Sequence, residues 1–247
     1  MSGHNKWSTI KHTKAKNDAA NAKVFSKILR EMTVAVKEGG SDPNSNNRLK
    51  NVILKAKSAN MPNDNISRTI KKASGELGSI NYQDIVYEGY GPAGSAVIVE
   101  VLTDNKNRTA SEIRHYFDKY GGNLGTTGNV SYLFNKVGEI IVLKGKGYSD
   151  DEIVSYALDA EADDVVIEDT YYKIVTTPAN FDNVKNYLEK VNVSVEDAEI
   201  NLVPDNYIDL SEDKLISFQK LISALEDNDD VQNVYHNVNL PEEEDEE

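Results

Sequence analysis

The spacing of apolar residues predicts three helices in the first third of the chain. From about residue 14 to residue 38, apolar side chains recur every three or four positions, at Phe25, Ile28, Leu29, Met32 and Val36. This spacing is typical of an amphipathic helix. Residues 44–59 and 62–74 show the same pattern, and the first and third segments end at glycines, Gly39 and Gly75. We therefore predict a small bundle of three helices.

After residue 78 the pattern changes to alternating strands and helices. Residues 95–102 are rich in β-branched side chains, as in a buried strand, and the helix that follows opens with a capping-box sequence at Thr109–Glu112. Residues 130–134 predict a further strand. Residues 136–203 then follow the order strand, helix, strand, strand, helix, strand, with a second capping box at Ser149–Glu152. This is the ferredoxin-like order.

The last helix, around residues 215–225, and the last strand, 231–237, are too few elements for a domain of their own. We expect them to complete the unit that begins at residue 95. The predicted fold class is α+β multidomain, with an N-terminal helical bundle followed by two ferredoxin-like α/β domains, one inserted in the other. The predicted domains are a basic helical domain with a mobile N-terminal arm (1–78), a discontinuous α/β domain (79–134 plus 204–240), an inserted ferredoxin-like domain (135–203) and an acidic tail (241–247).

Composition places the chain among globular proteins. It has 247 residues, of which 39% are hydrophobic and 28% charged. No apolar run reaches the roughly 18 residues that span a bilayer, and the first residues lack the apolar stretch of a signal peptide. The absence of cysteine excludes disulfides, Cys-based zinc sites and thiol catalysis. We expect a cytoplasmic protein with no membrane partner.

The charge is divided sharply along the chain. Residues 1–78 hold 15 Lys and Arg against six Asp and Glu, a formal charge of +9, whereas residues 79–247 carry −23. A basic segment attached to an acidic body is typical of proteins that bind polyanions. The alternative is an ordinary helical domain with solvated lysines. The candidate nucleic-acid-binding residues on the helices are Lys14, Lys16, Lys23, Lys27, Arg30, Lys50, Lys55, Lys57, Arg68, Lys71 and Lys72.

The first 13 residues add aromatic side chains to this basic segment. Trp7 and His12 lie among lysines, with Lys6 and Lys11 beside them. Bases stack on aromatic rings while lysines pair with phosphates, so the arm suits RNA or a flexible single strand. Alternatively, Trp7 packs the arm onto the bundle.

Two glycine-rich segments resemble nucleotide-binding loops only superficially. Residues 89–94 match GxGxxG, but a strand follows the motif where a dinucleotide site needs a helix. We expect a tight turn there. Residues 121–128 lack the Gly-Lys-Ser/Thr of a phosphate loop, so a helix end followed by a turn explains them. The flexible backbone of residues 121–128 could still approach a ligand closely, and the sequence leaves the role of both segments open.

A secondary anion contact is predicted where a strand passes into a helix at residues 104–109. Helix starts bind anions through free backbone amides, and Asn105, Asn107 and Arg108 lie there. Simple helix capping is the alternative. The four histidines show no metal-ligand spacing and no serine has an evident base nearby. An enzyme is not excluded, because catalytic partners meet only in the fold, but nothing in these residues favours one. We expect no catalytic residue, metal site or small-molecule substrate.

Several motifs resemble the YebC family, which includes the mitochondrial translational activator of cytochrome c oxidase. They span almost the entire chain in order, at Gly3–Trp7 with Ile10–His12, Lys55–Arg68, Tyr87–Pro92, Leu102–Thr109 and Leu225–Asn237. The resemblance implies three domains, no enzymatic activity and no cofactor. The chain departs from the family pattern at Ala20-Asn21, where many relatives carry basic residues, and this weakens the phosphate contacts expected of the first helix.

The resemblance leads to two functional hypotheses, and the residues add a third. The family is described as probable DNA-binding transcriptional regulators, and other members resemble translation factors that act on ribosomes stalled at proline-rich stretches. The third helix offers Arg68, Lys71 and Lys72, which suit phosphates, but no evident set of base-reading side chains. The lysine-rich arm with Trp7 fits ribosomal RNA or tRNA somewhat better than DNA. The third hypothesis is a module whose basic domain docks on an acidic protein partner.

Overall fold

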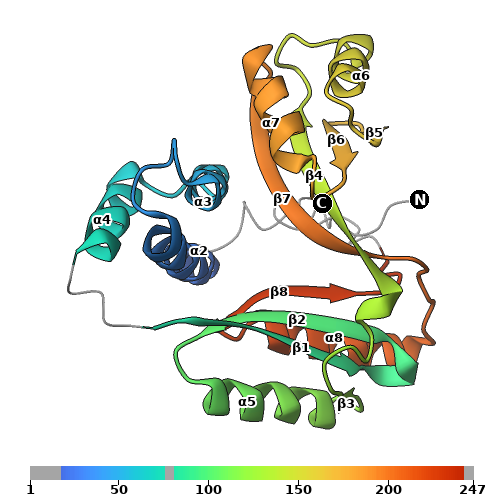
Figure 1. Ribbon diagram of the computed structural model, residues 1–247. Helices are drawn as coiled ribbons and strands as arrows, with labels where there is room; N and C mark the ends of the chain where they lie inside the picture. Colours follow the sequence, from blue (N-terminus) through green and yellow to red (C-terminus); the bar gives the residue numbers. More distant parts are fainter. Residues whose placement is uncertain (1–17, 76–80, 242–247) are drawn as a thin grey trace. The chain divides into compact units, whose positions relative to one another are not determined.

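The computed structural model describes residues 18–75 and 81–241 of the chain. It begins with helices α2 (Asp18–Gly39), α3 (Asn47–Ser58) and α4 (Asn63–Ser74), which confirms the three predicted helices (Figure 1). Apolar positions predicted to face a core are buried, among them Ile28, Met32, Leu49, Val52, Ala56 and Ile66. The predicted N-terminal arm and the acidic residues beyond 241 lie outside the described residues.

The turn between α2 and α3 is fixed by Asn46, which is buried. Its side-chain oxygen accepts a hydrogen bond from the Leu49 amide at 3.0 Å and caps α3. Its Nδ2 donates to the carbonyls of Ala35 and Gly40 at 2.7 and 2.8 Å, near the end of α2. One amide side chain thus satisfies backbone groups at two helix ends that would otherwise lack partners.

The described chain forms two compact units. The first contains residues 18–30, 81–135 and 203–241, and the second contains residues 31–75 and 136–202. Each unit therefore combines a helical segment from the first third of the chain with an α/β part. The finer division into three domains stays a prediction.

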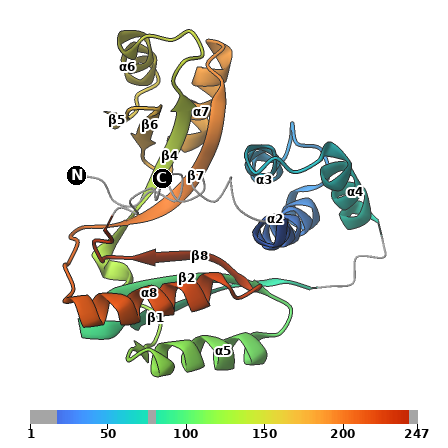
Figure 2. The same cartoon turned by 180° about the vertical axis from the view of Figure 1, so that it is seen from behind.

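A four-stranded sheet with strand order β3-β1-β2-β8 organises the first unit. Its strands are β1 (Gln83–Tyr90), β2 (Ala96–Thr103), β3 (Asn123–Leu124) and β8 (Val231–His236). Helices α5 (Lys106–Lys119) and α8 (Glu212–Glu226) lie along one face of the sheet (Figures 1 and 2). A core that includes Val97, Val99, Phe117, Phe218 and Leu221 is buried there. The C-terminal helix and strand thus complete the sheet to which residues 95–102 belong, as predicted.

The GxGxxG segment is a turn, as its flanking sequence predicts. A short 3-10 helix at Pro92–Gly94 joins β1 to β2, and these strands pair as antiparallel neighbours. Gly89 is required for a different reason, because a Cβ there would lie 2.7 Å from the Asn123 carbonyl oxygen of β3. The glycine therefore permits the close approach of two backbones.

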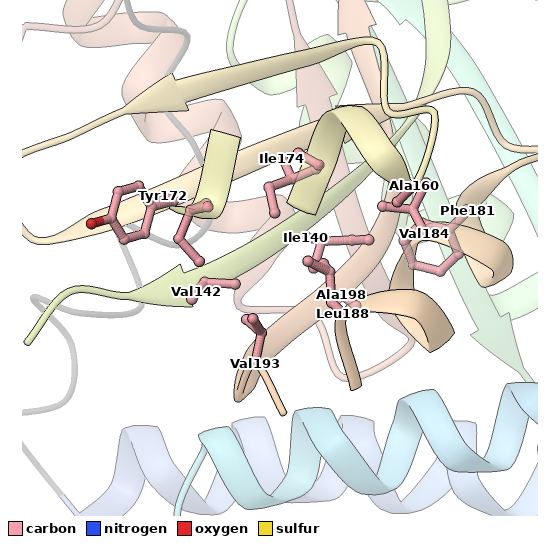
Figure 3. Packing of buried hydrophobic residues seen from close by; sticks show 12 residues of the cluster. Ile140, Val142, Ala160, Tyr172, Ile174, Phe181, Val184, Leu188, Val193 and Ala198 are labelled. Atoms are coloured by element: carbon pink, nitrogen blue, oxygen red, sulfur yellow. The ribbon is translucent and has the colours of Figure 1, made fainter. Parts of the chain in front are cut away.

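The second unit holds the predicted strand-helix-strand-strand-helix-strand run. Its elements are β4 (Phe134–Leu143), α6 (Asp150–Asp159), β5 (Asp164–Ile167), β6 (Tyr171–Thr176), α7 (Phe181–Lys190) and β7 (Val195–Pro204), with sheet order β5-β6-β4-β7. Ser149 and Glu152 form the predicted capping box at the start of α6. Side chains of Ile140, Ile174, Val184 and others pack between the sheet and its helices (Figure 3).

Two local predictions are wrong, and distant partners explain both. Helix α5 starts at Lys106 with Asn105 as its cap, whereas Thr109 is buried inside the helix and donates to the Asp230 carboxylate at 2.7 Å. Residues 130–133 form a bend and a 3-10 helix before β4, not a strand. The Glu88 carboxylate accepts the Val130 amide hydrogen at 2.9 Å and holds this bend.

Candidate nucleic-acid interface

Helix α4 presents an exposed basic face. Arg68, Lys71 and Lys72 are three and four residues apart, so they lie on one side of the helix. All three are exposed, while Ile66 and Ala73 on the opposite side are buried. Asp64, one turn earlier, is the acidic residue of the first turn. The face therefore offers three solvated cations, while the buried residues on the opposite side of α4 hold the helix in place.

Lys57, in the last turn of α3, belongs with these cations. It is exposed, and within residues 18–75 and 81–241 it forms no ion pair; the same holds for Arg68, Lys71 and Lys72. We call these four residues the open basic set. Long flexible cations that carry no internal partner can contact phosphates without first breaking a bond inside the protein.

Lys55, two residues before Lys57, has the opposite environment. Its ammonium lies 3.0 Å from Glu31 and 2.8 Å from Glu199, and all three side chains are at most about a quarter exposed. Burial would lower the pKa of Lys55, but the two carboxylates outweigh it and raise that pKa well above its usual value. Removing one member of such a group leaves uncompensated charge in a poorly solvated place. Lys55 is thus a structural cation that stabilises α3 against β7.

Lys50 lies on a polar contact between α3 and α7. Its ammonium is 2.7 Å from Glu189, and Asn47 donates to Asp182 at 2.9 Å one turn earlier. The same two helices are joined by Lys185 of α7, which donates to Asn51 of α3 and is only 2% exposed. Burial lowers the pKa of Lys185 below its usual value, although Asp182 opposes this. Lys50 is half-exposed in this contact and already has a carboxylate partner.

Three further predicted cations form a row on α2. Lys23, Lys27 and Arg30 follow at intervals of four and three residues, and each donates to residues 226–230, which run from the last residue of α8 to the start of β8. Their acceptors are side-chain and carbonyl oxygens of residues 226–230. The row is therefore engaged inside the first unit, unlike the open basic set.

Asp230 is the most connected group of that segment. Its side chain is 5% exposed and accepts from Arg30 and Arg108, each at 2.6 Å, and from the hydroxyls of Thr103 and Thr109 at 3.1 and 2.7 Å. Burial would raise the pKa of Asp230, but these donors together lower it to about 2. The carboxylate thus stays charged and ties α2, α5 and β2 to the start of β8.

The predicted secondary anion contact lies at the start of α5. Asn105 accepts from the Arg108 amide at 3.1 Å, which is the capping alternative that the sequence offered. The Arg108 guanidinium pairs with Asp230 and with Asp104, at 3.1 Å. Asn107 is exposed. Anion binding at these residues stays a prediction, and Arg108 would have to share its donors with two carboxylates.

The second glycine-rich segment is held by a single carboxylate. Glu88 of β1 accepts the amide hydrogens of Gly128, Val130 and Ser131, each at 2.9 Å, and is 3% exposed. Burial would raise the pKa of Glu88, but the three amides outweigh it and lower that pKa. The loop's inward amides are therefore occupied by the protein itself.

Sequence reasoning missed Asp230, Glu88 and Lys185. Lys185 gives a usable signal, because its spacing from Phe181 and Leu188 puts it on the buried face of α7. For Asp230 and Glu88 the partners are too distant in sequence to be foreseen. The predicted residues Lys6, Trp7, Lys11, His12, Lys14 and Lys16 lie outside the described residues.

The described part of the chain contains no group of three His, Asp or Glu side chains placed to hold a metal ion. Over the same residues, no helix is both long and apolar enough to cross a bilayer.

Known proteins resemble this chain over nearly its full length. The TACO1/YebC protein N-terminal domain matches residues 5–76, and the TACO1/YebC second and third domain matches residues 82–238. The chain belongs to the TACO1/YebC family. This confirms the resemblance seen in the sequence motifs.

Members of the TACO1/YebC family with similar sequences carry names of regulators. The chain is 52% identical to a probable transcriptional regulatory protein of Thermoanaerobacter pseudethanolicus, with both chains covered completely. It is 54% identical to a protein of the same name from Acetivibrio thermocellus, over 96% of this chain and 98% of the relative. These names describe regulators of transcription and not enzymes.

A solved structure shares the fold of this TACO1/YebC protein. The crystal structure of a conserved hypothetical protein from Aquifex aeolicus superimposes with a TM-score of 0.83 and 45% sequence identity, covering 97% of this chain and 98% of the other. The mixed architecture of helices and two antiparallel sheets is therefore that of a known relative.

Proposed function

We propose that this protein is a non-enzymatic regulator of gene expression that binds the phosphate backbone of a nucleic acid through the open basic set. The observation that carries the proposal is the contrast within the basic segment. Lys57, Arg68, Lys71 and Lys72 stay exposed and without ion pairs among the described residues, on a chain of net charge −14. Regulatory relatives at about 50% identity support the same conclusion.

The chemistry of the set suits phosphate and not bases. A Lys ammonium is a point charge on a flexible stem, and Arg presents a planar fork to two phosphate oxygens. Such contacts fix position on a nucleic acid but carry no sequence information by themselves. Target selection would then require other parts of the protein or the shape of the target.

The nucleic acid can be DNA, or RNA in the ribosome. A family of probable transcriptional regulators favours promoter DNA. The lysine-rich first residues, with Trp7 and His12 among them, favour ribosomal RNA or tRNA, because bases stack on aromatic rings. In that case the protein would act on translation, at ribosomes stalled on proline-rich stretches.

Crosslinking in cells separates these partners. Nucleic acid crosslinked to the protein would be recovered and sequenced. Enrichment of ribosomal RNA and tRNA would support the translational role, and discrete promoter fragments without ribosome enrichment would support the transcriptional one. Recovery of neither above a mock-tagged control would contradict nucleic-acid binding altogether.

A charge-matched pair of variants tests the interface itself. The triple variant Arg68→Gln, Lys71→Gln, Lys72→Gln removes the α4 face. The control Arg114→Gln, Lys214→Gln, Lys220→Gln removes one Arg and two Lys that are exposed on α5 and α8. We expect the α4 variant to bind nucleic acid much more weakly than the control. Equal affinities would show that only net charge matters and would refute the assignment to α4.

A further inference from the structure

The basic row of α2 sits against a strongly acidic turn of the same chain. Lys23 Nζ donates to Asp227 Oδ1 at 2.9 Å and to the Asp227 carbonyl at 3.4 Å. Lys27 Nζ donates to the Glu226 carbonyl at 2.6 Å, and Arg30 Nη1 to the Asp229 carbonyl at 2.9 Å and to Asp230 at 2.6 Å. Every cation in the row thus contacts this turn.

The turn concentrates negative charge in a small space. Residues 226–230 have the sequence Glu-Asp-Asn-Asp-Asp, with four carboxylates in five positions. It also begins at the last residue of α8, where carbonyl groups lack helical partners and the helix dipole is negative. A row of cations therefore meets closely spaced anionic and carbonyl oxygens, the kind of surface that a phosphate backbone presents.

The contacts differ in how easily they open. The Lys23 and Asp227 side chains are 49% and 69% exposed, so water and salt compete for them. The Arg30 and Asp230 side chains are 22% and 5% exposed, and Asp230 has three other donors. The outer end of the row is thus exchangeable, whereas Arg30 anchors the inner end.

We propose that the turn of residues 226–230 is an internal competitor that occupies the α2 row until a nucleic acid displaces it from Lys23 and Lys27. This rests on the proposed function and adds its regulation. The α2 row then contacts phosphates only when a polyanion replaces the turn. Isolated phosphates and acidic peptides then bind poorly, because they cannot outcompete a tethered array of carboxylates.

Zero-length crosslinking tests the competition directly. A water-soluble carbodiimide activates a carboxyl group, and a lysine in direct contact attacks it to form an amide with release of the urea. The 2.9 Å contact predicts a Lys23 to Asp227 crosslink in the full-length protein, seen as one joined peptide pair by mass spectrometry. The yield should fall at least severalfold when the protein is saturated with an RNA hairpin or a DNA duplex.

The Lys50 to Glu189 pair serves as an internal reference, because it involves no residue of the α2 row. Its crosslink should change less than that of Lys23. If bound nucleic acid leaves the Lys23 to Asp227 yield unchanged while binding is verified in the same sample, the internal competitor is refuted and the proposed function stands. If the protein binds neither probe at low salt, the proposed function itself fails.

A charge-matched variant pair gives the second readout. Asp227→Asn with Asp229→Asn weakens the turn, and Asp151→Asn with Asp163→Asn removes two exposed carboxylates elsewhere. The turn variant should bind the same probe about two- to fivefold more tightly than the control, as expected for the loss of one exposed ion pair, Lys23 to Asp227, and of the nearby Asp229 charge. Equal tightening in both variants would mean that only the overall charge acts and would overturn the proposal.

Discussion

Asp230 offers the sharpest test of how the first unit is held together. Its buried carboxylate accepts two guanidinium and two hydroxyl donors. The substitution Asp230→Asn keeps the size of the side chain but removes its charge and one acceptor atom. Arg30 and Arg108 each lose an ionic partner, and a buried donor is left without its acceptor.

The magnitude follows from the depressed pKa. The pKa of Asp230 is about 2 against an ordinary 3.8, and each unit corresponds to about 1.4 kcal/mol. Allowing for screening at the more exposed Arg108, the charged form contributes about 2 kcal/mol to the free energy of unfolding. Because the folded pKa lies below the unfolded one, this contribution is complete above about pH 5 and is lost as the pH falls toward 2.

Urea unfolding, monitored by circular dichroism, measures both the loss of stability and its dependence on pH. At pH 7 we expect Asp230→Asn to lower the free energy of unfolding by about 2–4 kcal/mol. Asp227→Asn, on an exposed neighbour, should cost less than about 1 kcal/mol. The gap between wild type and Asp230→Asn should also shrink by about 2 kcal/mol between pH 5 and pH 2. A gap that is constant with pH would refute the assignment of the stabilisation to the charged carboxylate.

Other substitutions test further single contacts. Lys55→Met should destabilise the second unit by about 3–5 kcal/mol in the same urea assay, since it leaves two carboxylates facing each other, while Lys57→Met should change little. Glu88→Gln should cost about 1–3 kcal/mol and speed hydrogen exchange of the three amides it holds, measured by NMR. Gly89→Ala should lower the thermal midpoint because its Cβ would clash with the backbone of β3, whereas Gly75→Ala, with its nearest atom 3.7 Å away, should be tolerated.

Local patterns predicted most of the fold. Within each of the three helical segments, apolar residues such as Ile28, Leu49 and Ile66 recur every three or four positions, and this spacing predicted α2, α3 and α4. One buried face is enough to specify an amphipathic helix. The β-branched run at 95–102, together with the C-terminal helix and strand that had no domain of their own, indicated a sheet made from distant segments. These features depend on short-range periodicity and on the need to bury every apolar face.

Tertiary contacts decided what the sequence could not show. Thr109 has the pattern of a helix cap, but Asp230, 121 positions away, draws it into a buried network instead. In the candidate interface, Lys55 and Lys57 look equivalent in the sequence, yet only the first meets Glu199 of β7. Charge along the chain thus predicted a basic surface, and only the fold showed which cations are already neutralised.

The salt dependence of nucleic-acid binding tests the central claim most directly. Affinity of the full-length protein for a DNA duplex and for an RNA hairpin would be measured over a range of salt concentrations, together with the α4 triple variant and its control. Each phosphate contact contributes about 0.7–0.9 to the slope of log affinity against log salt. Loss of Arg68, Lys71 and Lys72 should therefore reduce the slope by about two to three units, with little change in the control. A slope that is unchanged in the α4 variant would contradict the account.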